Sequence, residues 1–396
     1  MESFAADWLN LLFRWAHLIA GVGWIGTSFY FIGLDLSLRK REGLDKDVYG
    51  SAWQVHGGGF YNVEKYLVAP KKLPDDLVWF KWEAYLTWVT GFALLVVQYY
   101  YNASSYLIDP NVMALEPWQA ISISVASLIG GWLIYDGICR SPLGRNTGVL
   151  AVCLFILIMA ASILFSYVFS GRGALIHVGA FVGTIMAVNV FGIIIPNQKK
   201  VAAALMRGEE PEARFGIMGK QRSVHNNYLT LPVLLMMVSN HYPMLTGHPH
   251  SWLLVALILI IGGAVRHLLN RHEAGDTFRQ FAWTLPVAGV GVIIAMIMTA
   301  PVERDYGSDQ VTDTVVMDIV QTHCTTCHAT KPSVDWVEEA PQGVKLESIA
   351  DIKRYLDRIK AQSVDSDAMP LGNETGMTEE ERTTLGAWIA QNKDTE

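Results

Sequence analysis

Residues 148–169 read GVLAVCLFILIMAASILFSYVF and contain no charged side chain. A helix needs about 20 consecutive apolar residues to cross the hydrocarbon of a bilayer. The helix is favoured there because it pairs its own backbone N–H and C=O groups, each of which costs several kcal/mol when left unpaired in hydrocarbon. This stretch therefore predicts a membrane-spanning helix.

Composition and further segments extend the prediction to most of the chain. Of 396 residues, 51% are hydrophobic and 17% are charged, whereas a soluble domain carries about 25% charged residues. An ordinary soluble enzyme is therefore excluded. The first apolar segment is not a cleaved signal, because no basic residue precedes it and it is too long. With 148–169, the predicted spans number eight: 8–34, 82–101, 117–136, 174–195, 225–243, 251–270 and 281–300 are the others.

Charge divides the chain into two parts. From Glu303 onward there are 19 acidic and 9 basic residues, whereas residues 1–301 hold 18 acidic and 21 basic ones. We predict a membrane domain over 1–301, a linker over 302–318 and a small helical domain over 319–396. The chain lacks a strongly basic face, so no nucleic-acid partner is expected, and four cysteines are too few for a disulfide framework.

Basic residues also predict the orientation. Lysine and arginine gather in the loops that stay in the cytoplasm, and here they gather between spans 1 and 2, 3 and 4, 5 and 6, and 7 and 8. The opposite loops offer only Arg172. Both termini should then face outward, which in a bacterial inner membrane is the periplasm.

The membrane domain contains an internal echo at an offset of 160 residues. The sequence HLIAGVGWI from His17 aligns with HVGAFVGTI from His177. Four helices per unit would insert the two units the same way up, related by an axis along the membrane normal. We therefore predict an all-α fold, an eight-helix transmembrane bundle built as a tandem 4+4 repeat. Small residues also recur in membrane helices for packing alone.

The acidic tail contains Cys324-Thr-Thr-Cys327-His328, the C-x-x-C-H attachment site of c-type haem. Two thiols bond to the porphyrin and the histidine ligates the iron. Met369, 41 residues after His328, is the expected sixth ligand, with Met317 and Met377 as weaker rivals. We predict a class I cytochrome c domain with one covalent haem. A zinc knuckle is the alternative, but no two further Cys or His residues follow His328 to complete it.

Ionisable residues in the membrane segments suggest a second site. His17 and His177 are repeat-related, and His241 lies toward the same side as Arg14 and Arg172. Ionisable groups within a membrane are functional candidates by default. The two repeat-related imidazoles could hold a b-type haem or bind a polar substrate. The alternative is that each only forms a hydrogen bond to a neighbouring helix.

Polar residues also gather toward the cytoplasmic face. Three glycines in His56–Tyr61 would let a backbone approach a ligand closely, and the amides and charges nearby suit a planar heterocycle or an anion. The alternative is that these residues cap helix ends. This group comprises His56–Tyr61, Glu64, Lys65, Ile195–Gln198, Arg222 and His225–Asn227.

Long phrases in the chain resemble a known family. HLIAGVGWIG, VHGGGFYNVEKY, KWEAYLTWVTG, GRGALIHVGAFVGTIMAVNVFGIIIPNQKK and SVHNNYLTLPVLLMMVSNHYP are similar to sequences of the membrane-bound, cytochrome c-fused urate oxidases of bacterial purine catabolism. The resemblance covers the full length, including the CTTCH tail.

The resemblance implies oxidation of urate to 5-hydroxyisourate, with water supplying the hydroxyl oxygen. Electrons would leave through haem c to a soluble or membrane cytochrome c and a terminal oxidase, so hydrogen peroxide is not expected. We predict catalytic roles for His17, His177 and His241, since a histidine suits activation of water. Urate is expected to contact Arg14, Arg172 and Asn189.

Two other functions stay open at this point. The chain could be a quinol-linked electron-transfer subunit of the membrane without substrate chemistry of its own, or a transporter with a redox appendage. The membrane face at which urate binds is also open. A cytoplasmic site would be separated from haem c by about 30 Å of hydrocarbon, and a b-type haem would then have to bridge that distance.

Overall fold

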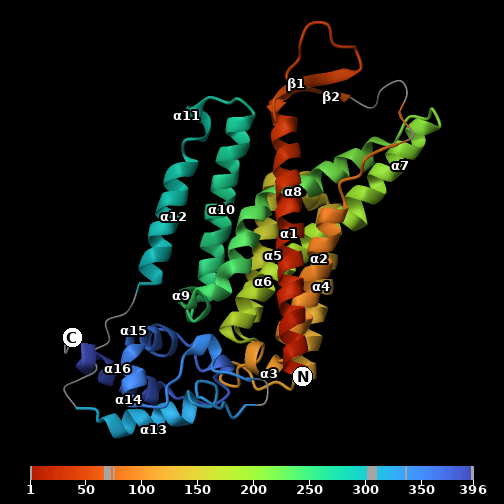
Figure 1. Cartoon of the computed structure of the whole chain (residues 1–396). Coiled ribbons are helices and arrows are strands. Elements are labelled where there is room, and N and C mark those ends of the chain that lie inside the picture. The colour runs from red at the N-terminus through yellow and green to blue at the C-terminus, as the bar shows by residue number, and fades with distance from the viewer. Residues whose placement is uncertain (1, 67–72, 75, 301–309, 335–336, 394–396) are drawn as a thin grey trace.

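A computed structural model of the chain describes residues 2–66, 73–74, 76–300, 310–334 and 337–393. Long helices form a bundle, and a smaller helical region, here called the tail, lies against one end of it (Figure 1). The first residues of the chain lie at the tail end, and a two-stranded hairpin projects from the opposite end (Figure 1). These two ends are called the tail end and the hairpin end below.

The bundle is built from long helices joined by short helical turns. The long elements are α1 (Glu2–Ser37), α2 (Trp82–Leu94) with η1 (Leu95–Tyr100), α4 (Pro117–Arg140), α5 (Thr147–Ser166), α6 (Gly171–Val188) with η3 (Asn189–Ile194) and α7 (Ile195–Met206), α8 (Ala213–Val238), α10 (Ser251–Glu273) and α12 (Thr284–Met298). The short ones are α3 (Ala103–Tyr106), η2 (Pro142–Arg145), η4 (Ser239–His241), α9 (Pro243–Thr246) and α11 (Phe278–Phe281).

Local sequence explains where several of these helices begin. Asn146 precedes α5, and its side chain accepts the backbone N–H of Val149 at 3.1 Å. Ser170 does the same for Gly173 at the start of α6. Glu116 and Gln119 form a reciprocal capping box ahead of α4. Each cap satisfies backbone N–H groups that lack a partner in the first helical turn.

Six helices in the described ranges are long and apolar enough to cross a membrane. They cover six of the eight predicted spans: Phe4–Ser37, Pro117–Arg140, Thr147–Ser166, Gly171–Met206, Ser251–Glu273 and Phe278–Met298. The other two expected spans, 82–101 and 225–243, are also largely helical, in α2–η1 and α8. Polar residues lower the mean hydropathy of these two segments, so they are not among the six. These residues are Glu83 and Gln98 in α2–η1 and His225–Asn227 in α8.

The bundle packs around α6. In the most apolar stretch of Gly171–Met206, 67% of residues are buried, against 6% in the first span. Helix α6 lies against α4, α5 and α8, and their buried side chains form one apolar core. Helix α1 packs mainly on α2 and leaves large apolar side chains on the surface, among them Leu12, Trp15 and Ile19. An apolar outer surface suits a bundle surrounded by lipid.

A β-hairpin stands where the sequence analysis expected an irregular ligand-binding loop. Strands β1 (Val48–His56) and β2 (Gly59–Tyr66) pair antiparallel, with His56 opposite Gly59. Gly57 and Gly58 form the two-residue turn with φ of 58° and 80°, a conformation that glycine adopts without steric cost. The fold is therefore mostly helical but not all-α, and the glycines serve the turn.

The tail consists of short helices around a core of its own. Trp388 is 1% exposed at its centre, and its Nε1 donates to Asp313 Oδ1 at 2.8 Å. Residues 302–309 of the predicted linker, 302–318, lie outside the described residues, and its last part is already helical from Asp313. The tail elements are α13 (Asp313–His323), η5 (Pro341–Gly343), α14 (Ile349–Arg354), α15 (Leu356–Ile359), η6 (Lys360–Val364), η7 (Leu371–Asn373) and α16 (Glu379–Lys393).

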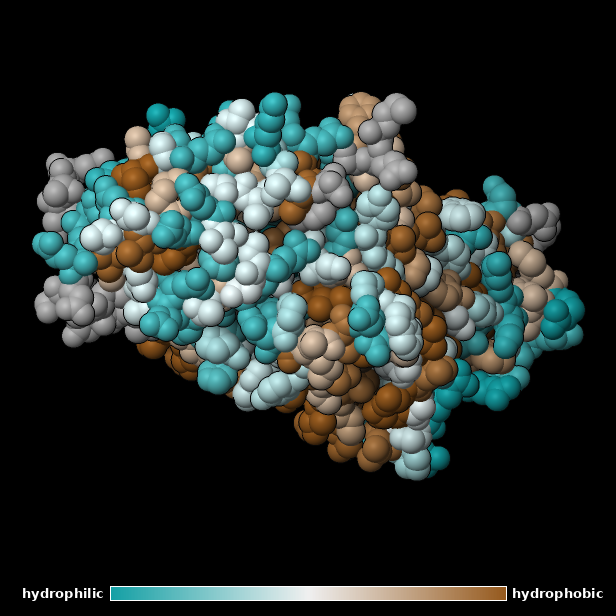
Figure 2. Space-filling model, turned by 90° about the horizontal axis from the view of Figure 1, so that it is seen from below, coloured by the Kyte–Doolittle hydropathy of each residue, from teal (hydrophilic) through white to brown (hydrophobic). Residues whose placement is uncertain are grey.

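The tail docks on the bundle through close backbone contacts. Ser105 in α3 donates to Glu374 Oε1 at 2.6 Å. A Cβ on Gly372 would lie 2.7 Å from the Ser105 carbonyl oxygen, and one on Gly247 would lie 2.5 Å from Ser366 Cβ. Seen from the tail end, the surface carries many hydrophilic side chains, while hydrophobic ones gather on the flank of the bundle (Figure 2).

Candidate functional site

One cavity of about 1660 Å³ runs between α1, α2–η1, α6 and α8 and continues into the tail. It exceeds the roughly 300–1,000 Å³ of an ordinary small-molecule site. Its lining at the tail end joins Arg14, His17, Arg172 and His241 of the bundle to the Cys324–His328 motif of the tail. The two groups of residues that the sequence singled out thus share one space.

Arg14 and Tyr99 are held in place where the bundle meets the tail. Arg14 donates from Nη2 to Gln98 Oε1 at 2.7 Å and to Asn10 Oδ1 at 3.1 Å. Tyr99 is 4% exposed, and its hydroxyl accepts a hydrogen bond from Asn240 Nδ2. These bonds fix polar side chains along the cavity wall.

Arg172 is the second residue of α6 and lines the same end of the cavity. Its Nε is buried without a hydrogen-bond partner among the described residues, and so is Oδ1 of Asn240. Buried polar atoms normally have a partner, and the start of a helix carries partial positive charge. The wall therefore offers a charged donor and an acceptor to a bound polar anion.

His17 presents one ring nitrogen to the cavity. Its Nδ1 lies 2.9 Å from the Thr87 carbonyl oxygen, which can only accept, so Nδ1 carries the proton and Nε2 is the basic nitrogen. Gly91 makes room for the ring, since a Cβ there would lie 2.8 Å from His17 Cε1. The hydrogen bond and the glycine together orient a neutral imidazole that can accept a proton.

His177 has a different environment from its repeat-related partner. It is fully buried, its Nδ1 lies 2.7 Å from the Gly173 carbonyl oxygen, and its Nε2 lies 2.7 Å from Ser124 Oγ. It is not among the residues that line the cavity. Both nitrogens are engaged, so neither is open to a substrate or a haem iron. The geometry favours the hydrogen-bonding alternative for His177, and its catalytic role stays a prediction.

His241 and Asn189, two further predicted site residues, also differ in their position relative to the cavity. His241 is exposed at the end of η4 and lines the cavity. Asn189 is fully buried and does not line it; its Nδ2 donates to Tyr135 Oη at 3.0 Å and to Asn226 Oδ1 at 3.1 Å. Contact of Asn189 with substrate stays a prediction that this position does not favour.

Asn189 belongs to a buried polar network toward the hairpin end. Tyr135 Oη is 2.7 Å from His225 Nδ1, and the Arg222 guanidinium lies 4.8 Å from the centre of the Tyr135 ring and pairs with Asp136 at 2.6 Å. These contacts tie α4, η3 and α8 together. The polar group predicted near the cytoplasm is therefore partly a helix-packing network, and His56–Tyr61 stands apart from it in the hairpin.

The tail end of the cavity carries the C-x-x-C-H motif. Cys324, Cys327, His328 and Met369 all line it. His328 Nδ1 lies 2.9 Å from the Val344 carbonyl oxygen, so Nδ1 carries the proton and Nε2 can ligate a metal. Burial raises the pKa of the Cys324 thiol to about 12, so this thiol is not an activated nucleophile. Two thiols and a free imidazole nitrogen on an apolar cavity suit attachment of a porphyrin.

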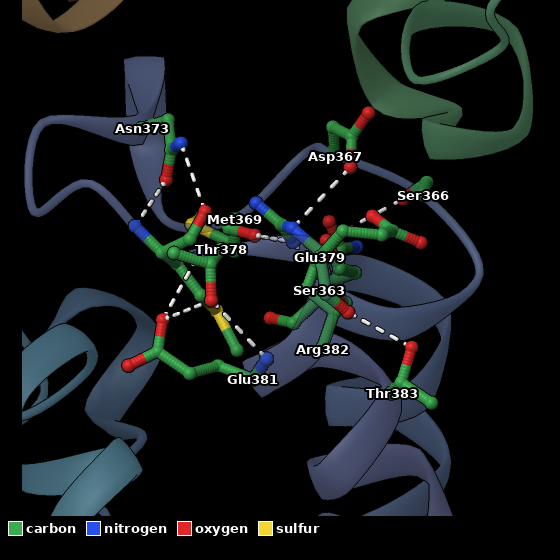
Figure 3. Close-up of polar contacts among 12 residues, drawn as sticks. Ser363, Ser366, Asp367, Met369, Asn373, Thr378, Glu379, Glu381, Arg382 and Thr383 are labelled. Carbon is green, nitrogen blue, oxygen red and sulfur yellow. Dashed lines mark hydrogen bonds and ion pairs between the residues drawn. The ribbon is translucent and has the colours of Figure 1, made fainter. Parts of the chain in front are cut away.

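Three methionines of the tail are candidate iron ligands, and of these Met369 alone lines the cavity. Its backbone is fixed by Arg382 of α16, which is 4% exposed and donates from Nη1 to the carbonyl oxygens of Met369 and Ser363 at 2.8 and 2.7 Å (Figure 3). The rivals are elsewhere: Met377 is buried in the tail core, and Met317 packs against that core.

Comparison with known proteins decides the family. A family model described as urate oxidase N-terminal matches residues 3–300. The chain belongs to this family. Membership implies a urate-oxidising enzyme, and the match covers the whole described bundle and stops before the tail. No curated protein and no solved structure matches the chain.

For this member of the urate oxidase N-terminal family, the cavity adds residues that the sequence analysis missed. Gln98, Tyr99, Tyr106 and Asn240 line it beside Arg14 and Arg172. The signal available was a run of polar and aromatic residues at the end of the second predicted span, VVQYYYNASSY, and Asn240 directly before His241. Neither pattern reveals that the two segments meet.

Proposed function

We propose that this chain oxidises urate at the tail end of the cavity and passes the electrons to the tail. The observation that carries the proposal is the shared cavity, which joins Arg14, His17, Arg172 and His241 to Cys324, Cys327 and His328. Urate and its electron acceptor would then occupy adjoining parts of one space, and no second cofactor across the membrane is needed. The family match supplies urate as the substrate.

Recognition of urate rests on Arg172. Near neutral pH urate is a planar monoanion, and the unpaired Nε of Arg172 and the unpaired Oδ1 of Asn240 complement a ring that carries acceptors and N–H donors. Arg14, held by Gln98, adds a second positive charge. Tyr99 and Tyr106 add aromatic surface to the same wall.

His17 is the proposed base. The urate monoanion and water give neutral 5-hydroxyisourate, one proton and two electrons, and the C–O bond forms as water loses a proton. Nε2 of His17 is the acceptor for that proton, because Nδ1 already donates to the Thr87 carbonyl. His241, exposed on the same cavity, would carry the proton to solvent.

The cofactor proposed for the tail is one covalent haem c. Cys324 and Cys327 would hold it, with Nε2 of His328 and Sδ of Met369 as iron ligands. When bound, it supplies one-electron acceptance at the edge of the urate site and transfer to a cytochrome c partner and a terminal oxidase. Arg382 and the Val344 carbonyl orient the methionine loop and the imidazole, respectively.

The proposed location is a bacterial inner membrane, with the chain crossing several times and its N-terminus and tail in the periplasm. The tail and the start of α1 lie at the same end of the bundle (Figure 1), and the loop lysines and arginines gather toward the other end. Haem c is attached outside the cytoplasm, which agrees with that orientation.

Anaerobic optical spectroscopy of the detergent-purified protein tests the proposal. Urate should reduce the c-type absorption band, and the His17→Ala variant should lose this reduction while dithionite still reduces its covalent haem. A wild-type spectrum that changes with dithionite but not with urate would contradict the proposal. A response to quinol instead would favour the electron-transfer subunit considered from the sequence.

A further inference from the structure

The cavity extends far beyond the proposed urate site. Along α1 its lining runs from Arg14 to Asp35, 21 residues apart and so about 30 Å at 1.5 Å per residue. That length matches the hydrocarbon thickness of a bilayer. The residues of α1 on the lining recur at helical spacing, including His17, Gly21 and Ser28, so one face of the helix borders the space throughout.

We propose that this cavity is a passage through which urate crosses the bundle from the hairpin end to the oxidation site at the tail end. The inference rests on the proposed function and adds directional substrate delivery to it. The enzyme would then draw urate from one side of the membrane and release electrons on the other.

Charge at the two ends fits an anion. The hairpin end carries a concentration of lysine and arginine, including Lys199 and Lys200 directly after Gln198 of the lining. The carboxylate at that end, Asp35, pairs with Lys65 at 2.5 Å and is thereby offset. Basic residues raise the local concentration of an anion, and the arginines at the tail end would bind it.

The middle of the passage is lined for a flat aromatic ring. Trp24, Trp88 and Phe92 border it, and Trp88 and Phe92 stack with ring centres 5.5 Å apart. Thr184 and Thr230 add hydroxyls. The aromatic faces suit stacking of a planar heterocycle, and the hydroxyls can form hydrogen bonds with its carbonyl and N–H groups, whereas a lipid chain would require neither.

The packing of α1 leaves room for passage. Helix α1 contacts α2 closely and the rest of the bundle sparsely, so α1 forms one wall of the space and α6 with α8 forms the opposite wall. Helix α2 closes the space along one side, where Trp88 Nε1 donates to Thr184 Oγ1 at 3.2 Å. Gly21 faces the space between these walls, and a Cβ there would meet nothing nearer than Thr87 Cγ2 at 4.0 Å. A large side chain at Gly21 would therefore project into the passage.

Proteoliposomes with the urate trapped inside test the passage. Ferricyanide, which does not cross the membrane, is added outside and accepts electrons only from molecules whose tail faces outward. Wild type should reduce ferricyanide with internal urate and with external urate. In Gly21→Phe, the rate with internal urate should fall at least tenfold, and the rate with external urate should fall less than twofold. Labelled urate should also leave wild-type vesicles faster than Gly21→Phe vesicles when no acceptor is present.

Gly26→Phe is the matched control. Gly26 lies on the same helix, has nothing within 4 Å of its Cβ position and is not on the lining, so both rates should stay at wild-type values. If Gly21→Phe also loses the rate with external urate, the same measurements are made on Ala180→Phe, which changes a residue of the opposite wall. Internal urate that gives no more signal than protein-free vesicles, or a plugged variant equal to wild type, overturns the passage. Absence of any rate with urate on either side instead contradicts the proposed function.

Discussion

Arg172 is the residue on which the proposed recognition of urate most depends. It lies at the start of α6, where the helix dipole adds positive potential, and its buried Nε has no partner among the described residues. A buried N–H group without a hydrogen-bond partner is costly. A substrate that completes its hydrogen bonding would recover that cost on binding.

Replacing Arg172 with Gln should therefore weaken urate binding. A hydrogen bond to a charged group contributes about 1.5–3 kcal/mol, so KM should rise roughly tenfold to a hundredfold with a smaller change in kcat. Steady-state kinetics with urate measure this. Arg140→Gln, which removes an exposed guanidinium at the other end of the bundle, should leave KM unchanged; an equal rise in both variants would exclude a specific role.

His177 should respond to substitution as a packing residue. His177→Ala removes the imidazole hydrogen bonds to the Gly173 carbonyl and to Ser124 Oγ, and opens a void beside Phe169, whose ring centre is 4.6 Å away. Lost burial and hydrogen bonds of this kind cost about 2–4 kcal/mol, so the thermal midpoint in detergent should fall. His241→Ala, an exposed control, should keep it. A stable His177→Ala protein without turnover would instead support the catalytic prediction.

The two histidines show how far the sequence alone could reach. Their repeat-related positions and similar neighbours gave no means of separating them. The difference arises from tertiary contacts: Gly91 of another helix leaves His17 beside the cavity, whereas Ser124, Phe165 and Phe169 enclose His177. Such contacts join residues far apart in the chain and leave no local pattern.

At the scale of elements, apolar length predicted the helices well because backbone pairing in lipid permits few alternatives. The sequence did not predict the hairpin, because 48–66 lies in the loop between the first two spans. Val48, Gly50, Ser51 and Ala52 are buried in β1, which also pairs with Arg39 through Ser51. Their burial depends on this folding and leaves no local pattern. The polar composition of α8 reflects its network with α4 and η3, which hydropathy cannot anticipate.

Helix α16 offers an element-level prediction about pH. Thr378 and Glu381 cap each other's backbone N–H groups, and Glu381 Oε1 lies 3.1 Å from His323 Nε2 of α13. The Thr378 backbone N–H, more than any other group, holds the pKa of Glu381 below its ordinary value of 4.5. A carboxyl whose pKa is lowered by folding stabilises the fold above its unfolded pKa, and this stabilisation is lost as the pH falls through the lowered value.

Glu381→Gln should therefore speed hydrogen exchange of the α16 amides at pH 7 by about threefold to tenfold. The gap to wild type should narrow as the pH falls below 4.5. Exchange rates corrected for the intrinsic effect of pH measure both. Glu380→Gln removes the same charge from the same helical turn and leaves the reciprocal cap in place, so a similar loss of protection there would rule out the capping explanation.

At the scale of the whole molecule, the proposed function requires the tail and the bundle to remain docked, because the cavity takes its wall from both. Contacts between α3 and η7 hold them together, with Gly372 seated on the carbonyl oxygens of Ser104, Ser105 and Ile108. None of this docking could be predicted from the sequence, which indicated two regions and their chemistry but no contact between them.

Gly372→Ala should separate the two regions without unfolding either. The new Cβ would lie 2.7–3.0 Å from three carbonyl oxygens of the bundle, and the residue has a φ of 59°, so the tail must shift. Reduction by urate should fall at least tenfold while reduction by dithionite is retained. Gly376→Ala is the matched control, because Gly376 has a φ of 70° but nothing within 4 Å of its Cβ position. It carries the same backbone strain without the clash. Equal losses in both variants would show that strain within the tail, and not its docking on the bundle, controls electron transfer.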